Sequence, residues 1–212
     1  MGLKNIVIIT SVVNAPRSLS IFTPKERLMQ LEYTVKTVRE KIPNCEIFLV
    51  NGGGMPDDLK TSYEALNVEH RVESSVFSEH KRVGEILMID YLLSTEEFLK
   101  ATSCNINKIV KISGRYFLKD EFVFDDTEKV VFKTVEPQNS WSKHGICETR
   151  YYSFPFYLLD LYRSGVKRIV NEGVFIDMEH TFYKNKILPF TENSNKIQVA
   201  GYLAPNGNYI ED

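Results

Sequence analysis

The hexapeptide KISGRY, which begins at Lys111, holds the groups best suited to bind an anion. Lys111 stands inside an otherwise apolar strand pattern, where an ammonium is costly to bury unless it reaches a carboxylate or a phosphate. Arg115 shares an alternating face with Lys111 and Ser113 if the strand continues. A guanidinium offers the paired donors that suit a pyrophosphate. We therefore expect an anion site here, to which Gly114 and Tyr116 also belong.

A second basic cluster, SEHKRVGE, starts at Ser78, just before or at the start of a helical pattern. Free backbone amides at the N-terminus of a helix already favour an anion. His80 and Lys81 are therefore candidates to meet a phosphate, although a solvated basic turn remains open as the alternative. Arg17, in the loop after the first predicted strand, is a further candidate for the same ligand.

The best carboxylates for general-base chemistry lie in the segment GVFIDMEH, residues 173–180. On a helix, Asp177 and His180 share one face at a spacing of three residues. Glu179 has apolar neighbours that would raise its pKa, which makes it the better base. Asp177 is the second catalytic candidate, and a carboxylate on an outer helix surface remains the alternative for Glu179.

Several common catalytic motifs are missing from the sequence, namely GxxxxGK[ST], GxGxxG, HExxH, CxxC and GxSxG. Their absence argues against P-loop hydrolases, the dinucleotide-binding fingerprint, common zinc sites and the nucleophile elbow of hydrolases. Cys45, Cys104 and Cys147 are widely separated, which fits reduced thiols and argues against a disulfide framework or a zinc site.

Apolar periodicity predicts the elements that would position these residues. Strands are expected at residues 5–10, 45–50, 68–72, 108–112, 129–135 and 149–153. Helices are expected at residues 24–42, 56–66, 78–99, 156–163 and 171–183. Strands and helices that alternate over the first 120 residues imply a parallel, doubly wound sheet.

The residues that follow each predicted strand should meet at one edge of this sheet. In open α/β sheets, ligands bind beyond the carboxyl ends of the strands, where the strand order switches direction. Thr10 and Ser11 follow the first strand, Asn51 follows the second, and the SGRY segment follows the strand at residues 108–112. We therefore expect these three polar segments to form one ligand site.

Length and charge narrow the class of protein. A chain of 212 residues fits a single domain over residues 1–212, and a formal net charge of -2 gives no general attraction to nucleic acid. The apolar stretch near the N-terminus is too short for a signal peptide or a membrane span. We expect a cytoplasmic protein with neither a nucleic-acid partner nor a membrane span.

Five stretches of the chain resemble a group of GT-A-like proteins that occur in bacterial polysaccharide clusters and large viruses. They are TSV at 10–12, FTPKERLMQL at 22–31, IPNCEIFLV at 42–50, VGE at 83–85 and, most specifically, KISGRY at 111–116. The likeness covers about the first 150 residues. It implies a GT-A-like three-layer α/β fold with a mostly parallel central sheet, in which residues 1–120 bind a nucleotide-sugar and residues 121–212 bind an acceptor.

The resemblance also implies how charge is balanced in the site. In ordinary GT-A enzymes, the strand that corresponds to residues 108–112 ends in a DxD motif, which holds a divalent ion against the pyrophosphate. Here Ser113, Gly114 and Arg115 stand in that place. Arg115, with Lys81 or Lys111, would then supply the positive charge that the metal supplies. A contribution from Mn²⁺ or Mg²⁺ stays open.

By the same resemblance, the residues after the first two strands would contact the nucleoside, and the helix that carries Glu179 would approach the acceptor. Trp141 lies in a polar loop where its ring could stack on a sugar, although filling of the core is an equal alternative. The candidates for the acceptor side are Trp141, His144, Arg150 and His180.

The leading hypothesis is a hexosyl- or pentosyltransferase of polysaccharide biosynthesis, which moves a sugar from a nucleotide-sugar to a hydroxyl of a glycan or glycoprotein. Glu179 would act as the base of a direct, inverting displacement. A sugar nucleotidyltransferase is one alternative, although residues 11–20 lack the glycine-rich signature of such enzymes. A non-catalytic domain that binds nucleotide-sugars or glycans is the other, since catalysis rests on one carboxylate.

Overall fold

The computed structural model describes residues 2–74, 83–137, 143–173, 177–189 and 197–211. Its elements are, in chain order, β1 (Lys4–Ser11), α1 (Pro24–Lys41), β2 (Cys45–Gly52), η1 (Asp57–Leu59), α2 (Lys60–Glu64), β3 (His70–Ser74), α3 (Gly84–Leu93), α4 (Glu96–Ala101), β4 (Ile106–Ser113), β5 (Tyr116–Leu118), β6 (Val131–Val135), β7 (Ile146–Pro155), η3 (Phe156–Leu158), α5 (Leu159–Glu172), α6 (Met178–Asn185), β8 (Val199–Tyr202) and β9 (Tyr209–Glu211). Within these residues, no helix combines the length and the apolar character that a membrane crossing requires.

The central sheet has six strands in the order β3-β2-β1-β4-β7-β6. The first four are parallel to one another, and β7 runs antiparallel to both of its neighbours, β4 and β6. The chain moves outward from β1 to β3 and then returns to place β4 on the other side of β1. The prediction of a mostly parallel α/β sheet is confirmed, and the switch in strand order lies between β1 and β4.

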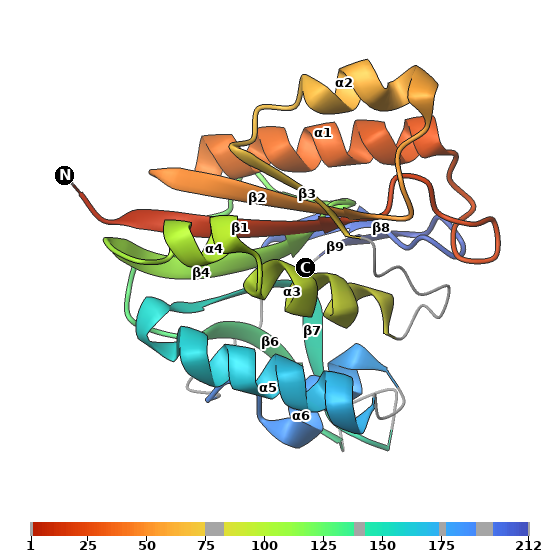
Figure 1. The fold of residues 1–212 in the computed structure, drawn as a ribbon. Coiled ribbons are helices and arrows are strands. Elements are labelled where there is room, and N and C mark those ends of the chain that lie inside the picture. The colour runs from red at the N-terminus through yellow and green to blue at the C-terminus, as the bar shows by residue number, and fades with distance from the viewer. Residues whose placement is uncertain (1, 75–82, 138–142, 174–176, 190–196, 212) are drawn as a thin grey trace.

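Helices cover both faces of the sheet, with α1 and α2 on one face and α3 and α5 on the other (Figure 1). Alternate side chains of β1 enter opposite cores: Ile6 and Ile8 pack on the α3 and α5 side, and Val7 and Ile9 pack on the α1 side. Burial on both faces explains why the first strand reads as an unbroken apolar run.

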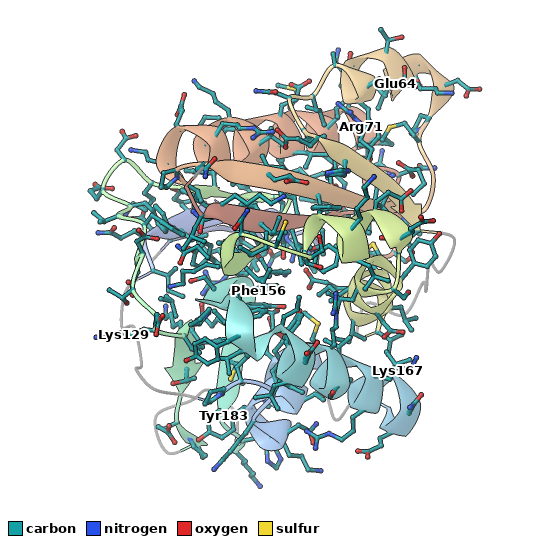
Figure 2. The ribbon with its side chains drawn as sticks, turned by 60° about the vertical axis from the view of Figure 1, so that its left-hand side comes forward. Glu64, Arg71, Lys129, Phe156, Lys167 and Tyr183 are labelled. Atoms are coloured by element: carbon teal, nitrogen blue, oxygen red, sulfur yellow. The ribbon has the colours of Figure 1, made fainter. Side chains whose placement is uncertain are left out.

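The turned view in Figure 2 separates the outer layers of the protein. Glu64 and Arg71 lie on the side of α1 and α2, and Lys167 of α5 and Tyr183 of α6 lie on the far side of the sheet. The Tyr183 hydroxyl donates to Glu136 at 2.5 Å, and this bond, followed by burial, raises the pKa of Tyr183 to about 12. The α6 layer is thereby tied to the chain just after β6.

The first helix begins where the sequence predicts. The Thr23 side chain accepts from the Glu26 backbone, and the Glu26 side chain accepts from the Thr23 backbone at 2.7 Å. Such a reciprocal cap, followed by proline, is a strong signal for a helix start. Further along α1, the buried Thr34 hydroxyl donates to the Tyr116 carbonyl at 2.7 Å. The helix therefore holds the strand β5, which continues the chain beyond the KISGRY turn.

Several element boundaries differ from the sequence prediction. The long helix expected at residues 78–99 is two helices over its described part, because Thr95 caps a new helix by accepting from the Phe98 backbone at 3.3 Å. The helix expected at 171–183 starts only at Met178, and the one expected at 156–163 opens with a 3-10 turn and runs to Glu172.

A small antiparallel sheet, β5-β8-β9, was not predicted. Its strands are short and come from distant parts of the chain, so no local periodicity marks them. The strand β8 runs very close to the KISGRY turn, because a Cβ atom at Gly201 would lie 2.4 Å from the Arg115 carbonyl oxygen. Glycine at this position lets the small sheet close over that turn.

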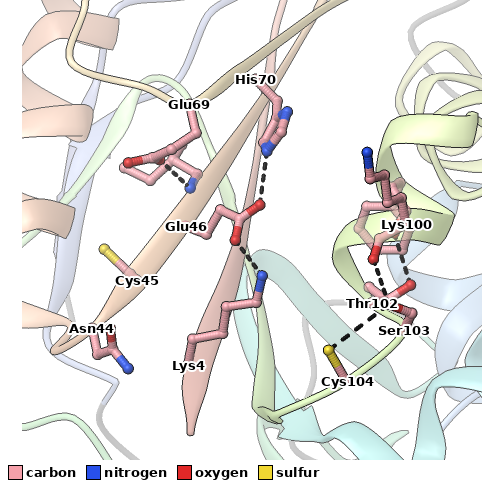
Figure 3. A network of polar contacts seen from close by, with 12 residues as sticks. Lys4, Asn44, Cys45, Glu46, Glu69, His70, Lys100, Thr102, Ser103 and Cys104 are labelled. Atoms are coloured by element: carbon pink, nitrogen blue, oxygen red, sulfur yellow. Dashed lines mark hydrogen bonds and ion pairs between the residues drawn. The ribbon is translucent and has the colours of Figure 1, made fainter. Parts of the chain in front are cut away.

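A polar cluster lies at the amino ends of the first three strands (Figure 3). One carboxylate oxygen of Glu46 accepts from Lys4, and the other lies 2.7 Å from His70 Nε2. Partial burial alone would raise the pKa of Glu46, but the bonds from Lys4 and His70 outweigh it and hold this pKa below its ordinary value. Cys45 beside this cluster is a free thiol, as are Cys104 and Cys147.

Candidate functional site

A pocket of about 450 Å³ lies at the carboxyl ends of β1 and β4, where the strand order switches. Thr10 pairs with Ser113, and Ser11 pairs with Asn51, so the three polar segments that follow the strands do meet, as predicted. The charged side chains that line the pocket are Arg27, Glu85, Arg115, Arg150, Asp177 and Glu179.

The floor of the pocket depends on a close contact between β4 and β1. The Gly114 backbone donates to the Thr10 carbonyl at 2.8 Å. A Cβ atom at Gly114 would lie 2.8 Å from the Leu31 side chain and 3.3 Å from that same carbonyl. A side chain here would force the Leu31 side chain to move and would press on the end of β1, so glycine is the residue that fits this close contact best.

Lys111 is fully buried beneath this floor and does not line the pocket. Its ammonium forms an ion pair with Glu85, donates to Ser113 Oγ at 2.8 Å and donates to the Thr149 carbonyl at 2.6 Å. An ammonium has three protons, and these contacts use all of them. The sequence left either a carboxylate or a phosphate as the partner of Lys111, and in the structure the partner is the carboxylate of Glu85.

Glu85 gathers the polar side chains of the floor. Besides Lys111, it accepts from the Thr10 hydroxyl at 2.5 Å and from the Ser113 hydroxyl at 2.9 Å. Burial alone would raise the pKa of Glu85, but the nearby Lys111 ammonium and these bonds outweigh it and hold this pKa below its usual range. Glu85 is therefore ionised at neutral pH.

Three arginines line the pocket, and one of them, Arg150, is paired with Glu148. Arg115 is positioned by stacking, with its guanidinium carbon 5.0 Å from the Tyr116 ring centre. Its Nε is buried and has no hydrogen-bond partner among the described residues. Arg27 is only 7% exposed and donates to the Val12 carbonyl at 2.5 Å and to Ser20 Oγ at 3.3 Å. Burial and then the charge of Arg115 lower the pKa of Arg27 to about 10.

On the α6 side, the pocket carries two carboxylates with different surroundings. Asp177 caps the helix, since its Oδ1 accepts from the His180 backbone at 2.9 Å and lies 2.7 Å from His180 Nδ1. Asp177 and His180, which were predicted to share a helix face, therefore contact each other, although Asp177 precedes the helix as its cap. Burial and then the negative charges of Asp177 and Glu85 raise the pKa of Glu179. Of these two carboxylates, Glu179 is therefore the better candidate for a general base.

No protein-family model matches this chain, and no curated protein matches it either. In the part of the chain that the structure describes, no three His, Cys, Asp or Glu side chains are grouped so that they could hold a metal ion. The chemistry of the site must therefore be inferred from its own geometry.

Most of the residues predicted for the site do line this pocket. They are Thr10, Ser11, Ser113, Gly114, Arg115, Tyr116, Arg150, Asp177 and Glu179. His80, Lys81 and Trp141 lie outside the described residues. The remaining candidates, Arg17, Asn51, Lys111, His144 and His180, are described but do not line the pocket.

The predicted site residues that do not line the pocket make other contacts within the protein. Asn51 is buried, with its side chain accepting from the Val13 backbone at 3.1 Å and donating to Glu73 at 3.0 Å. Arg17 donates to the Ile21 carbonyl at 3.0 Å on the surface. The buried His180 ring packs edge to face against His144, with ring centres 6.1 Å apart. Asn51 and Arg17 thus hold loops near the pocket.

Sequence reasoning missed Glu85 and Arg27 as members of the site. Arg27 stands four residues before Leu31 on the buried face of α1, and a cation on an apolar helix face was a usable signal. Glu85 follows the glycine at the start of α3. Nothing local distinguishes it from a solvated glutamate, because its partners come from β1 and β4.

Proposed function

We propose that this protein is a glycosyltransferase that moves a sugar from a nucleotide-sugar to a hydroxyl of a glycan or glycoprotein. The observation that supports this most directly is the position of Arg115, which lines a pocket at the switch point together with Arg27. A guanidinium suits a phosphate, because it can donate two parallel hydrogen bonds to it. The strand order and three-layer build are compatible with a GT-A-like fold.

The charge distribution favours a diphosphate as the anion. Arg27 and Arg115 are close enough that one lowers the pKa of the other, so an anion between them would relieve their repulsion. Lys111 is already neutralised by Glu85, and it supports the floor instead of meeting the ligand. We therefore assign the diphosphate to the two arginines, and we expect transfer without added Mn²⁺ or Mg²⁺.

Glu179 is the proposed base. Its raised pKa suits a carboxylate that takes a proton from a hydroxyl. In the proposed step, the acceptor oxygen bonds to the anomeric carbon while the bond from that carbon to the diphosphate oxygen breaks. The acceptor proton passes to Glu179, and the electron pair leaves with the nucleoside diphosphate, where the arginines stabilise it. A single displacement of this kind inverts the anomeric carbon.

Thermal shifts with nucleoside diphosphates and nucleotide-sugars, with and without Mn²⁺, test the donor part of this proposal. A ligand at about 100 times its Kd adds about 2.7 kcal/mol to the free energy of unfolding, which a melting curve detects. Arg115→Ala should weaken nucleoside diphosphate binding by at least about tenfold, because a charged hydrogen bond is lost. Arg168→Ala, an exposed arginine on α5 that donates to the Asn185 carbonyl, is the matched control.

The outcomes separate the three functions that the sequence left open. Stabilisation by nucleotide-sugars together with transfer to a glycan supports the proposal. Release of pyrophosphate from a nucleoside triphosphate and a sugar phosphate would indicate a nucleotidyltransferase instead. Binding without either reaction would indicate a non-catalytic domain. A protein that no nucleotide stabilises would contradict the proposal and the nucleotidyltransferase, and would leave only a domain that binds glycans.

A further inference from the structure

One oxygen of the Glu85 carboxylate is unused. The ion pair with Lys111 and the hydrogen bonds from Thr10 and Ser113 all end on Oε1. Across the described ranges, no hydrogen bond or ion pair reaches Oε2. The side chain is 25% exposed and lines the pocket, so this second oxygen is accessible to a ligand.

The chemistry of Oε2 limits what it can bind. Lys111 keeps Glu85 ionised, and an ionised carboxylate only accepts hydrogen bonds. A phosphate would be repelled, because it is itself an anion with only acceptor oxygens. A metal cation is disfavoured, since Lys111 already neutralises this carboxylate and Arg115 adds a second positive charge nearby. A neutral hydroxyl donor fits best, and the two lone pairs of Oε2 allow two of them.

The three bonds to Oε1 also hold the carboxylate in place before any ligand arrives. A ligand that meets Oε2 does not have to order this side chain, so little conformational entropy is lost on binding. Glu85 lies in α3 and its donors lie in β1 and β4, which makes the position of the carboxylate a property of the fold.

We infer that Glu85 binds a vicinal diol of the ligand through its free Oε2. This inference rests on the proposed function, because a diphosphate held by Arg115 is flanked in a nucleotide-sugar by two rings with adjacent hydroxyls. One is the ribose of the nucleoside, and the other is the donor sugar. Both offer the same chemistry to Glu85, and the experiment distinguishes them.

Calorimetric titration of the full chain with matched ligands tests the inference. The first arm compares nucleoside diphosphates with their 2′-deoxy and 3′-deoxy forms, and the second compares nucleotide-sugars with versions that lack a sugar hydroxyl. Loss of the relevant hydroxyl should weaken binding to the wild-type protein about tenfold or more, as expected for a hydrogen bond to a charged group. The arm that responds identifies the ring that Glu85 binds.

The Glu85→Gln variant gives the decisive comparison. Its single carbonyl oxygen has to accept from Lys111, which turns the amide NH₂, a donor, towards the pocket. The loss of affinity on removal of the hydroxyl should therefore fall to less than about threefold. The double variant Glu85→Gln/Lys111→Met, which removes both charges of the ion pair, should show the same small loss of affinity and guards against misfolding of the single variant.

Glu73→Gln is the matched control, because Glu73 pairs with Asn51 outside the pocket, and it should keep the full loss of affinity. Analogues that bind as tightly as their parents in both arms would overturn the inference, although the proposed function would stand. So would a loss of affinity that is unchanged in Glu85→Gln, or Mn²⁺ alone binding to the wild type and not to this variant. Failure of every nucleotide to bind would overturn the proposed function together with the inference.

Discussion

The two ends of the sheet carry the same types of charged residue in different arrangements. At the amino end, the two oxygens of Glu46 are shared between Lys4 and His70, and the cluster is partly exposed (Figure 3). At the carboxyl end, Lys111 and two hydroxyls converge on a single oxygen of Glu85. A carboxylate with both oxygens occupied stabilises the fold locally, whereas one with an open oxygen in a pocket can bind a ligand.

The largest expected difference between the ends concerns catalysis. Glu179→Gln should lower kcat by about 10²- to 10⁴-fold, because the proposed base is lost. It should leave nucleoside diphosphate binding nearly unchanged. Glu46→Gln makes the same chemical change at the amino end and should keep full activity. Initial rates of sugar transfer measure both, and equal losses would show that Glu179 has no special role.

Substitution of Lys111 and of Lys4 should lower the free energy of unfolding by different amounts. Lys111→Met removes a fully buried ammonium and leaves the half-buried Glu85 carboxylate without its counter-charge, which should cost about 3 kcal/mol, the lower end of the range for a broken buried pair. Lys4→Met breaks a partly exposed pair, which costs about 1 kcal/mol or less. Denaturant unfolding gives both values, and a loss for Lys4→Met as large as that for Lys111→Met would contradict the distinction between the two ends.

The pKa shifts at the two ends predict opposite responses to pH. Glu46 has a lowered pKa in the folded protein, so its contribution to stability is present above its unfolded pKa and is lost as pH falls through the folded value. Glu179 has a raised pKa, so the folded state loses stability as pH rises from the unfolded value through the folded one.

Comparing each Gln variant with the wild type over about pH 3–8, a range that includes the ordinary carboxyl pKa values and extends above them, tests this difference. The rate of transfer should also rise with pH through an apparent pKa above the ordinary glutamate value, because the base must be deprotonated. A rising limb that persists in the residual activity of Glu179→Gln would assign that pKa to another group.

The smallest expected effect concerns the support of Glu85. Thr10→Val removes one of the three donors to Oε1 and should cost about 1 kcal/mol of unfolding free energy. Ser94→Ala is a suitable control, since that hydroxyl donates only to the backbone of α3. Chemical denaturation of the two variants measures the difference, and equal stabilities would mean that the Thr10 bond contributes nothing to the floor.

The sequence was informative where structure is local. The apolar run at β1 and the Thr23-Pro24 cap are determined by neighbouring residues, and both elements lie where they were predicted. The meeting of Thr10 with Ser113 also followed, since parallel strands with helical crossovers leave few arrangements of the strand ends.

The site was harder to predict because its contacts are tertiary. Asn51 was expected to follow its strand but lies within β2, and its side chain donates to Glu73 from the next strand. The partner of Lys111 could be narrowed to a carboxylate or a phosphate, but only the fold decides between them. Glu85 lies far from Lys111 in the chain, and no periodicity connects the two.

Gly114 has a consequence for anyone who wishes to change what this pocket accepts. Its backbone contacts Thr10, and its missing side chain makes room for Leu31, so a larger residue at this position would disturb the packing of α1 on the end of β1. The residues on either side of it both face the pocket. A library that randomises positions 113 and 115 while keeping glycine between them would therefore explore ligand choice, whereas one that also varies position 114 would change the packing beneath the pocket at the same time.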